Sequence, residues 1–352
     1  MNVGGTARYI ELLLENLPNN RLATGYVQGS EKEDPCVETF KTIRIPHMGR
    51  RISPIHDLYA WLELKKVIKE LQPVVVHTHT FKAGVLGRFI SGKHKRVHTY
   101  HGHLFDDDSF SKIQKRLITF TEKFLARRTD LLISVGKEVG SQLRAQGIGP
   151  NQKWLSIPPG VRSVSIISRD LARKNLGLDS QGILIGWMAR MAEVKNPFMF
   201  LEVAKELKDL NFVMAGGGEL LNDIQKIAPS NVKVIGWADA NIFWSAVNLG
   251  VSTSHNEGMP VALIEAQLAG VPIVATDVGS SAEVVENEVT GFVTAKKLEE
   301  MVSLIRMLAG NKELLDSMGA AAKKRATSEF NPSKMVTSHQ AAYSNLFRVS
   351  ED

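Results

Sequence analysis

Apolar and polar positions follow two alternating patterns along the whole chain. Short apolar runs rich in Val, Ile and Leu predict buried strands, and longer stretches with apolar residues every three or four positions predict helices. The predicted strands cover residues 21–28, 42–46, 74–77, 96–100, 131–135, 154–157, 183–188, 211–215, 232–235, 249–253, 272–276 and 291–294. The predicted helices include residues 7–17, 56–71, 112–128, 197–209, 261–269 and 298–309. This alternation indicates an α/β fold with parallel sheets covered on both faces.

The alternation occurs in two series that meet near Pro158-Pro159-Gly160. The length of 352 residues also favours two domains, because single hydrophobic cores stop growing at roughly 250–300 residues. We therefore predict two doubly wound domains facing a cleft, residues 1–162 and 163–330. The tail 331–349 has an amphipathic helix pattern and either caps the second domain or crosses back to the first.

The chain opens on the glycine loop 2–8, which contains Gly4-Gly5, leads straight into a helix and is preceded by Met1 alone. A doubly wound domain has a central strand before such a loop. Losing that strand should cost more than the roughly 5–15 kcal/mol by which a domain is stable. We therefore expect that the first N-terminal strand is missing, through a truncation or a misassigned start.

The composition is that of an ordinary globular protein, 43% hydrophobic and 23% charged. Cys36 is the single cysteine, which excludes an intrachain disulfide and favours a reducing compartment. No apolar run reaches the ~18 residues that a membrane span needs, and no signal peptide opens the chain. We therefore expect a cytoplasmic protein.

The net charge of +6 is unevenly distributed along the chain. Residues 1–165 hold 25 Lys and Arg against 15 Asp and Glu, and the remainder holds 18 against 22. A basic first half fits an anionic lipid, a pyrophosphate-linked acceptor or an inert basic surface. Nucleic acid is disfavoured, because no stacking motif or recognition fold accompanies the charge.

One basic segment, residues 111–128, has an amphipathic helix pattern. It fits peripheral contact with an anionic inner membrane, or a helix that covers its domain and has a solvated basic face. Phe120 and Phe124 are spaced as core residues of that helix.

The stretch 254–266 carries the most specific chemical signal. Glu257 lies in a strand-to-helix loop, Gly258-Met259-Pro260 forms the turn, and Glu265 lies about a turn and a half into the helix. Ligands of open α/β sheets bind beyond the carboxyl ends of strands, and a helix N-terminus suits a phosphate. A carboxylate beside a sugar or ribose can accept hydrogen bonds from two hydroxyls. These residues predict a bound nucleotide-sugar.

Other strand ends offer supporting groups. Arg190 and Lys195 follow the strand 183–188 and can hold a diphosphate, although cations are common at strand ends. The glycines 216–218, Gly217 among them, either approach a ligand or form a turn. Gly236-Trp237 follows another strand, and the tryptophan packs either against a base or in the core.

Histidines cluster in the first half, and His101 is the foremost candidate to contact the sugar or polarise a leaving group. Hydrogen-bonded strand-end histidines are the structural alternative. A metal site of His77, His79, His101 and His103 has no diagnostic spacing. The run Asp106-Asp107-Asp108 either binds a divalent cation or starts a helix. We expect no metal and no cofactor.

Taken together, the Glu257–Glu265 pair, Arg190 with Lys195, Gly4-Gly5 and His101-Gly102 resemble the retaining glycosyltransferases of family 4. That family has the GT-B fold of two Rossmann-like domains. The resemblance covers nearly the whole chain, and the segment 77–88 is similar to members that build bacterial capsule, exopolysaccharide or lipopolysaccharide.

The resemblance implies a role for each site residue. Glu257 would contact the donor sugar, Glu265 the ribose, and Arg190 and Lys195 the departing diphosphate. The donor-binding set would comprise Gly4, Gly5, Gly217, Gly236, Trp237, Gly258, Met259, Pro260 and Glu265, with His101 near the transferred sugar. Residues 1–162 would bind the acceptor, joined by the crossover helix 331–352, and residues 163–330 would bind the nucleotide sugar.

The expected activity is retaining transfer of a hexose or N-acetylhexosamine from a nucleotide-diphosphate sugar, foremost a UDP-sugar, to a glycan or lipid-linked acceptor. The alternatives are a catalytically impaired truncated copy, a non-catalytic nucleotide-sugar binder, and a GT-B nucleotide-sugar epimerase. The epimerase pattern differs from the two-glutamate loop found here.

Overall fold

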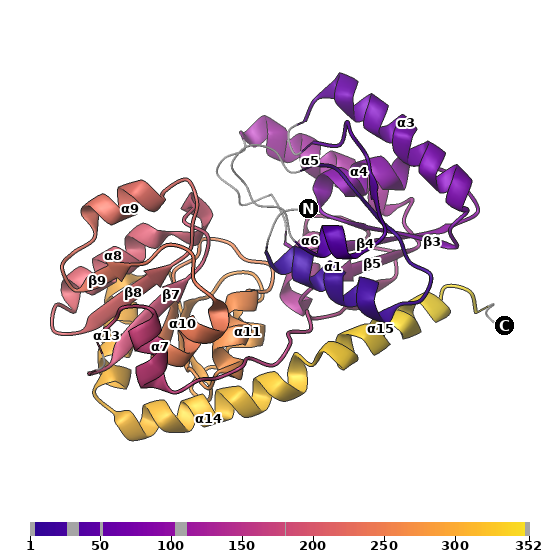
Figure 1. Ribbon diagram of the computed structural model, residues 1–352. Coiled ribbons are helices and arrows are strands. Elements are labelled where there is room, and N and C mark those ends of the chain that lie inside the picture. Colours follow the sequence, from indigo (N-terminus) through magenta and orange to yellow (C-terminus); the bar gives the residue numbers. More distant parts are fainter. Residues whose placement is uncertain (1–3, 27–34, 50–51, 103–110, 180, 349–352) are drawn as a thin grey trace. The chain divides into compact units, whose positions relative to one another are not determined.

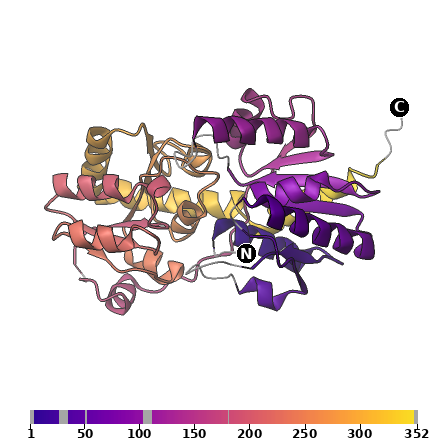
Figure 2. The same ribbon diagram turned by 90° about the horizontal axis from the view of Figure 1, so that it is seen from above.

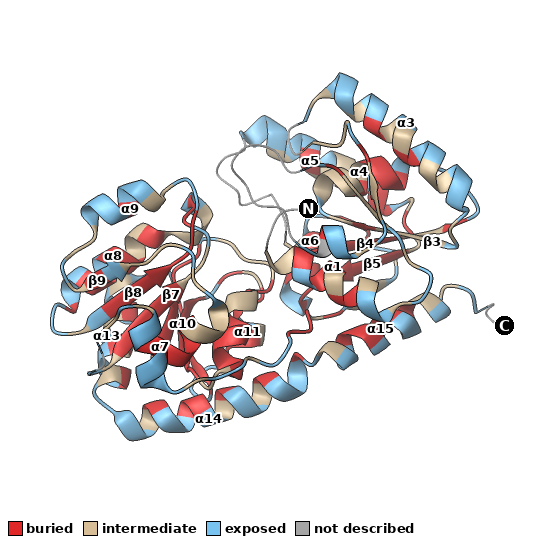
Figure 3. Ribbon diagram, in the orientation of Figure 1, coloured by how far each residue is buried: buried red, intermediate tan, exposed pale blue. Residues whose placement is uncertain are grey.

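A computed structural model describes residues 4–26, 35–49, 52–102, 111–179 and 181–348. The chain forms two compact units (Figures 1 and 2). Unit 1 comprises Met1–Gly160 and Pro332–Asp352, and unit 2 comprises Val161–Asn331. All strand pairings in the described ranges are parallel, which confirms the predicted α/β class. Figure 3 shows the strands of both units buried beneath partly exposed helices.

Unit 1 contains two separate parallel sheets. β1 (Leu22–Thr24) pairs with β2 (Thr42–Arg44). The second sheet has the order β3-β4-β5-β6, formed by β3 (Val75–His79), β4 (Lys95–Tyr100), β5 (Leu131–Ser134) and β6 (Trp154–Ser156). Within the described residues, which begin at residue 4, α1 (Gly5–Asn16) precedes the first strand.

Seven helices are described in unit 1. They are α1 (Gly5–Asn16), α2 (Cys36–Thr39), α3 (Pro54–Leu71), α4 (Phe81–Phe89), α5 (Lys112–Ala126), α6 (Lys137–Ala145) and α15 (Pro332–Ser344). Local sequence signals mark the start of two of these helices. Helix α3 begins at a proline, whose missing N–H is not needed in the first turn of a helix. A capping box of Ser111 and Gln114 starts α5.

A buried ion pair joins α4, α5 and β4. The Arg88 guanidinium donates to both carboxylate oxygens of Glu122 at 2.9 and 2.8 Å, and the Tyr100 hydroxyl donates to the same carboxylate at 2.7 Å. Glu122 raises the pKa of Arg88 against the opposing effect of burial. Because an unpaired buried charge is costly, this network fixes which face of α5 points inward.

The sequence interpretation of Phe120 and Phe124 as core residues is wrong. Both are exposed, because Ile118, Leu125 and Ala126 supply the buried face of α5 together with Glu122. Both aromatics lie on the opposite side of the helix.

The tail helix α15 belongs to unit 1 and packs against α1. The buried His339 ring donates from Nδ1 to the carbonyl of Met335 at 2.9 Å, so its Nε2 accepts from the Tyr9 hydroxyl at 3.1 Å. Tyr343 contacts Nδ1 of His77 at 2.6 Å. Polar contacts therefore tie the end of the chain to α1 and β3.

Unit 2 has one six-stranded sheet in the order β12-β11-β10-β7-β8-β9. Its strands are β7 (Leu184–Met188), β8 (Asn211–Ala215), β9 (Val232–Val234), β10 (Leu249–Ser252), β11 (Ile273–Thr276) and β12 (Gly291–Thr294). Its helices are α7 (Arg169–Asn175), η1 (Glu193–Lys195), α8 (Pro197–Glu206), α9 (Leu221–Ile227), α10 (Ala240–Ala246), α11 (Val261–Leu268), α12 (Ser281–Val284), α13 (Leu298–Ala309) and α14 (Lys312–Glu329). Apolar strand residues such as Ile185, Phe212 and Val251 form the core with α8 and α13.

The strand order creates a topological switch point between β7 and β10. From β7 the chain builds the sheet outward through β8 and β9, and from β10 it builds the other way through β11 and β12. The loops that leave β7 and β10 therefore diverge at the carboxyl edge of the sheet, which is where ligands bind in such folds.

Candidate active site

The two loops at this switch point meet through a charged pair. Lys195, in η1 after β7, places Nζ 2.6 Å from Oε1 of Glu257, in the loop after β10. The Ser254 hydroxyl donates to the same oxygen at 2.7 Å. The lysine side chain is 24% exposed and the glutamate side chain 9%. A half-buried cation and carboxylate are therefore held together at the predicted ligand edge.

A second set of hydrogen bonds holds the two loops in register. The Trp187 indole donates to the Thr253 hydroxyl at 3.1 Å, and that hydroxyl donates to the carbonyls of Lys195 and Asn196. The backbone N–H of His255 donates to the carbonyl of Val194 at 2.8 Å. The relative position of the lysine and glutamate backbones is thus set by buried groups rather than by the ion pair alone.

Gly279 supports the Glu257 loop from the next strand along the sheet. It has φ of +51°, and a Cβ there would lie 1.9 Å from the Glu257 carbonyl oxygen. The neighbouring Ser280 N–H donates to the Gly258 carbonyl at 2.9 Å. The sequence interpretation missed this contact and that of Ser254. Gly279 follows β11 at a strand-to-helix junction, which was a usable signal.

The two-glutamate segment folds as expected. Pro260 precedes the first turn of α11, and Met259 is buried. Glu265 lies on α11 and is also buried. The first-turn N–H groups of a helix lack intrahelical acceptors, so this N-terminus is suited to bind an anion near Gly258.

The ends of β8 and β9 meet beside the same edge. A Cβ on Gly217 would lie 2.1 Å from Nε1 of Trp237, so the indole packs directly on the glycine backbone. Gly216 N–H donates to the Gly236 carbonyl at 2.7 Å, and Gly236 has φ of +70°. The interpretation of Trp237 as a core residue is wrong, because it is 63% exposed. Arg190 is also exposed and follows β7 directly.

Gly4, Gly5 and His101 belong to unit 1. Gly4 precedes α1 with φ of +152° and ψ of −176°, and Gly5 begins the helix. His101 follows β4, lies edge-on to the Tyr9 ring with centroids 4.9 Å apart, and places Nε2 2.9 Å from Nδ1 of His79. The structure thus brings His101 against the helix that the glycine loop starts.

The buried histidines around His101 are neutral at pH 7. Burial, assisted by His339, lowers the pKa of His101 to about 3, and burial lowers that of His339 to about 4. Burial also lowers the pKa values of His77, His79 and His98. A neutral His101 can exchange hydrogen bonds with a sugar, but its remaining N–H is too weak an acid to protonate a leaving group.

The metal hypotheses find no support in the described residues. Within them no group of three or more His, Cys, Asp or Glu side chains is arranged to hold a metal ion. His103 and Asp106–Asp108 lie outside the described residues. None of the described helices is long and apolar enough to cross a membrane.

Two family models match this chain. Residues 3–163 match Glycosyltransferase Family 4, and residues 168–325 match Glycosyl transferases group 1. Fold and site thus define a glycosyltransferase. The chain belongs to the family-4-like glycosyltransferases of the GT-B fold.

Named relatives are similar along most of their length. A protein named UDP-Gal:alpha-D-GlcNAc-diphosphoundecaprenol alpha-1,3-galactosyltransferase from Escherichia coli is 28% identical over 94% of this chain and 91% of its own. The Staphylococcus aureus capsular polysaccharide biosynthesis glycosyltransferase CapM is 22% identical over 86% and 85%. Among solved structures, Anabaena Alr3699/HepE in complex with UDP-glucose has a TM-score of 0.81 at 19% identity, covering 98% of this chain and 97% of that one.

Proposed function

We propose that this protein transfers a hexose or N-acetylhexosamine from a UDP-sugar to a glycan or lipid-linked acceptor during bacterial surface polysaccharide synthesis, with retention of configuration. The observation that carries the proposal is the Lys195–Glu257 pair at the switch point of unit 2. The name of the similar Escherichia coli protein supports the donor and acceptor classes, and that of the Staphylococcus aureus protein supports polysaccharide synthesis.

The charges of the site suit a sugar diphosphate. The Lys195 ammonium and the exposed Arg190 guanidinium would neutralise negative charge as it builds on the departing diphosphate, without needing a metal. The Glu257 carboxylate, oriented by Ser254, would accept hydrogen bonds from the donor sugar. Glu265 would accept hydrogen bonds from the ribose hydroxyls, and the exposed Trp237 would stack on the base.

We propose that retention arises without a covalent intermediate, by attack from the side on which the diphosphate leaves. The bond between the anomeric carbon and the phosphate oxygen breaks, and its electron pair goes to the diphosphate. The acceptor oxygen then bonds to the same face, and its proton passes to the leaving phosphate. His101, neutral because its pKa is about 3, would take part only by hydrogen bonding.

The acceptor class also suggests where the protein acts. A lipid-linked acceptor would be reached at the cytoplasmic face of the inner membrane, where nucleotide sugars are available. This part of the proposal rests on the acceptor named for the Escherichia coli relative.

The direct test uses purified protein with UDP-galactose, UDP-glucose, UDP-N-acetylglucosamine and GDP-mannose. We expect one UDP-sugar to raise the melting temperature, and UDP to be released when an N-acetylglucosamine diphospholipid acceptor is added. NMR of the product should show an α-linkage from the α-linked donor. A β-linkage would refute retention, and donor binding without transfer would indicate a non-catalytic binder.

A further inference from the structure

Helix α5 carries an apolar ridge on its solvent side. Ile113, Leu117, Phe120 and Phe124 are separated by four, three and four positions, so they share one face of the helix. They are 79%, 63%, 70% and 41% exposed. We call these four residues the outer ridge. A helix that only covers its domain would present polar residues there, so the outer ridge requires another explanation.

The outward direction of the ridge is fixed by the core beneath it. Glu122 lies on the opposite face of α5, bound through both carboxylate oxygens to the buried Arg88. Rotating α5 to bury the ridge would pull this carboxylate out of the network and leave Arg88 unpaired. The outer ridge is therefore a stable surface feature.

Basic side chains line the ridge. Lys112, Arg116, Lys123 and Arg127 are exposed and lie along one flank of it, and we call these four the basic flank. The guanidinium of Arg128 lies 5.8 Å from the centre of the Phe124 ring. Glu122 is the single acidic residue between positions 112 and 128, and it is buried. The exposed surface of α5 thus combines apolar and positive groups without an exposed carboxylate.

Helix α3 also carries exposed apolar side chains. Figure 1 shows α4 between α3 and α5, and α4 packs against both. Ile55, Leu58, Tyr59 and Leu62 are exposed, and the buried residues Ala60 and Leu64 lie on the other side of α3. Figure 3 shows exposed outer surfaces on both helices. Two helices of unit 1, one on each side of α4, therefore carry exposed apolar side chains.

We propose that the outer ridge and basic flank of α5, with the exposed face of α3, dock unit 1 on an anionic lipid bilayer. Apolar side chains would enter the headgroup region while the basic flank contacts lipid phosphates. A second copy of the chain is a poorer occupant, because two basic flanks would repel each other. The proposal goes beyond sugar transfer and does not depend on which donor is used.

The test is flotation of the purified full-length protein with vesicles of phosphatidylcholine alone or mixed with phosphatidylglycerol. We expect wild type to float with the anionic vesicles, less so at high salt, and weakly with neutral ones. The double variant Leu117→Ser/Phe120→Ser should lose roughly ten-fold or more in affinity for each apolar side chain removed. Lys123→Glu/Arg127→Glu should lose at least roughly 25-fold on anionic vesicles, since each cation contributes about five-fold.

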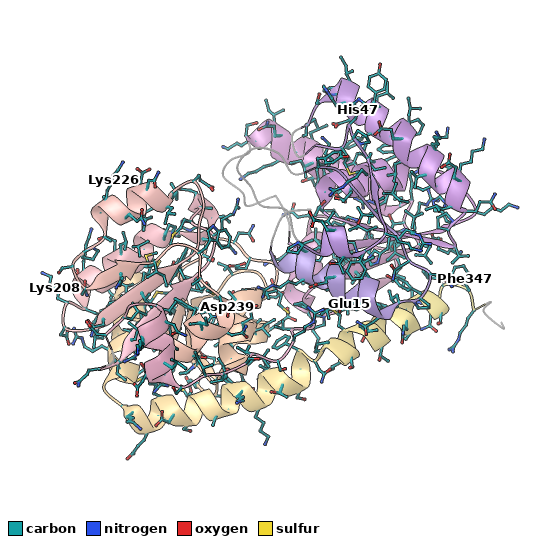
Figure 4. All side chains as sticks on the ribbon, viewed as in Figure 1. Glu15, His47, Lys208, Lys226, Asp239 and Phe347 are labelled. Carbon is teal, nitrogen blue, oxygen red and sulfur yellow. The ribbon has the colours of Figure 1, made fainter. Side chains whose placement is uncertain are left out.

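Matched controls lie on unit 2. Lys208→Glu/Lys226→Glu makes the same charge change at two exposed lysines, both labelled in Figure 4. Ile227→Ser removes an exposed apolar side chain from α9. We expect Ile227→Ser to float like wild type. The lysine double variant should float only slightly less than wild type, because its net charge is less positive. Because all changed residues are exposed, we expect every variant to melt within a few degrees of wild type.

A direct readout of insertion is Phe120→Trp, whose fluorescence should be quenched by brominated lipids, whereas Ile227→Trp should show no quenching beyond the wild-type background. Equal flotation of wild type and the ridge variant would overturn the proposal. The proposal would also be overturned if wild type bound no vesicles but formed a dimer, and if Leu117→Ser/Phe120→Ser abolished that dimer. The outer ridge would then be covered by a second copy of the chain. UDP-sugar binding without lipid should be unchanged in the ridge variants, and Lys195→Ala should float normally. These two results distinguish a failure of membrane docking from a failure of the proposed sugar transfer.

Discussion

The ammonium of Lys195 contacts the carboxylate of Glu257 at 2.6 Å, although 62 positions separate them in the sequence. They meet because β7 and β10 are adjacent parallel strands whose following loops leave the same edge of the sheet. At this point of the sheet, the lysine ammonium can contact a phosphate of a sugar diphosphate, and the glutamate carboxylate can accept hydrogen bonds from hydroxyls of its sugar.

We expect Lys195→Ala and Glu257→Ala each to reduce transfer at least about 100-fold, the scale of losing one transition-state stabiliser. The double variant should lose less than the product of the two single losses, because the residues interact directly. Initial rates of UDP release measure both effects. Lys205→Ala, which breaks the exposed pair with Glu202, is the matched control and should retain full activity. Near-normal rates in both single variants would show that the site is elsewhere.

Gly279→Ala should weaken donor binding at least about ten-fold, because its Cβ would collide with the Glu257 carbonyl and displace that loop. Isothermal titration with the preferred UDP-sugar measures the change. Gly177→Ala is the control: its φ of +62° imposes comparable backbone strain, but the nearest atom would be a lysine Nζ at 3.7 Å. If both variants bind equally, strain alone rather than displacement of the Glu257 loop is responsible.

Trp237→Ala should weaken nucleotide binding about 5- to 150-fold, corresponding to roughly 1–3 kcal/mol for aromatic stacking on a base. Trp237→Phe should restore most of the affinity, because a phenyl ring also stacks. Titration with UDP measures both variants without requiring transfer. Phe347→Ala removes another exposed aromatic and should have no effect. Unchanged affinity in Trp237→Ala would exclude stacking at this position.

Unit 1 should lose stability as the pH falls below about 6.5. The pKa of His101 is about 3 and that of His339 about 4, both below the unfolded value, so the folded state binds fewer protons. Stability is therefore complete above pH 6.5 and falls toward pH 4. Each buried histidine contributes about 1.4 kcal/mol per pH unit in that window.

The neighbouring Tyr9 and Tyr343 supply no compensating charge, since burial raises their pKa values. Urea unfolding between pH 7.5 and 4.5 measures the slope. His101→Gln should reduce the slope by up to about 1.4 kcal/mol per pH unit without abolishing it, because His77, His79, His98 and His339 remain. A flat profile in wild type would show that the histidines titrate normally in the folded state.

Transfer should proceed in the presence of a chelator, because the proposed cations Arg190 and Lys195 take the place of a metal. Rates of UDP release with and without EDTA test this. Loss of activity in EDTA that manganese restores would instead point to Asp106–Asp108.

The positions of the strands along the chain, and of the candidate site residues that follow them, could be predicted from the sequence, because both are local features. Buried β7, β8 and β10 lie where apolar runs placed them, and Glu257 and Lys195 follow two of them. The sequence could not predict which face of helix α5 is buried, because residues 112–126 contain two apolar faces. The choice between them depends on the pairing of Glu122 with Arg88, which comes from another helix.

Long-range contacts account for the other misses. The Gly279 backbone lies against the Glu257 carbonyl across two loops that follow neighbouring strands. Its place after β11 marks Gly279 as a candidate, but the residue that it packs against is not encoded locally. A large aromatic side chain such as that of Trp237 is expected in a core. Trp237 is nevertheless exposed, because the Gly217 backbone covers only one side of its indole.

The return of α15 to unit 1 affects the order of folding during synthesis. Unit 2 is one continuous segment, Val161–Asn331, whereas unit 1 needs Pro332–Ser344 to supply the partners of Tyr9 and His77. A ribosome releases these residues only after the whole of unit 2. The first half of the chain must therefore stay incompletely packed until unit 2 has been translated, although amino-terminal domains usually fold first. Slowed translation would lengthen this interval and with it the exposure of unit 1 to aggregation and proteolysis.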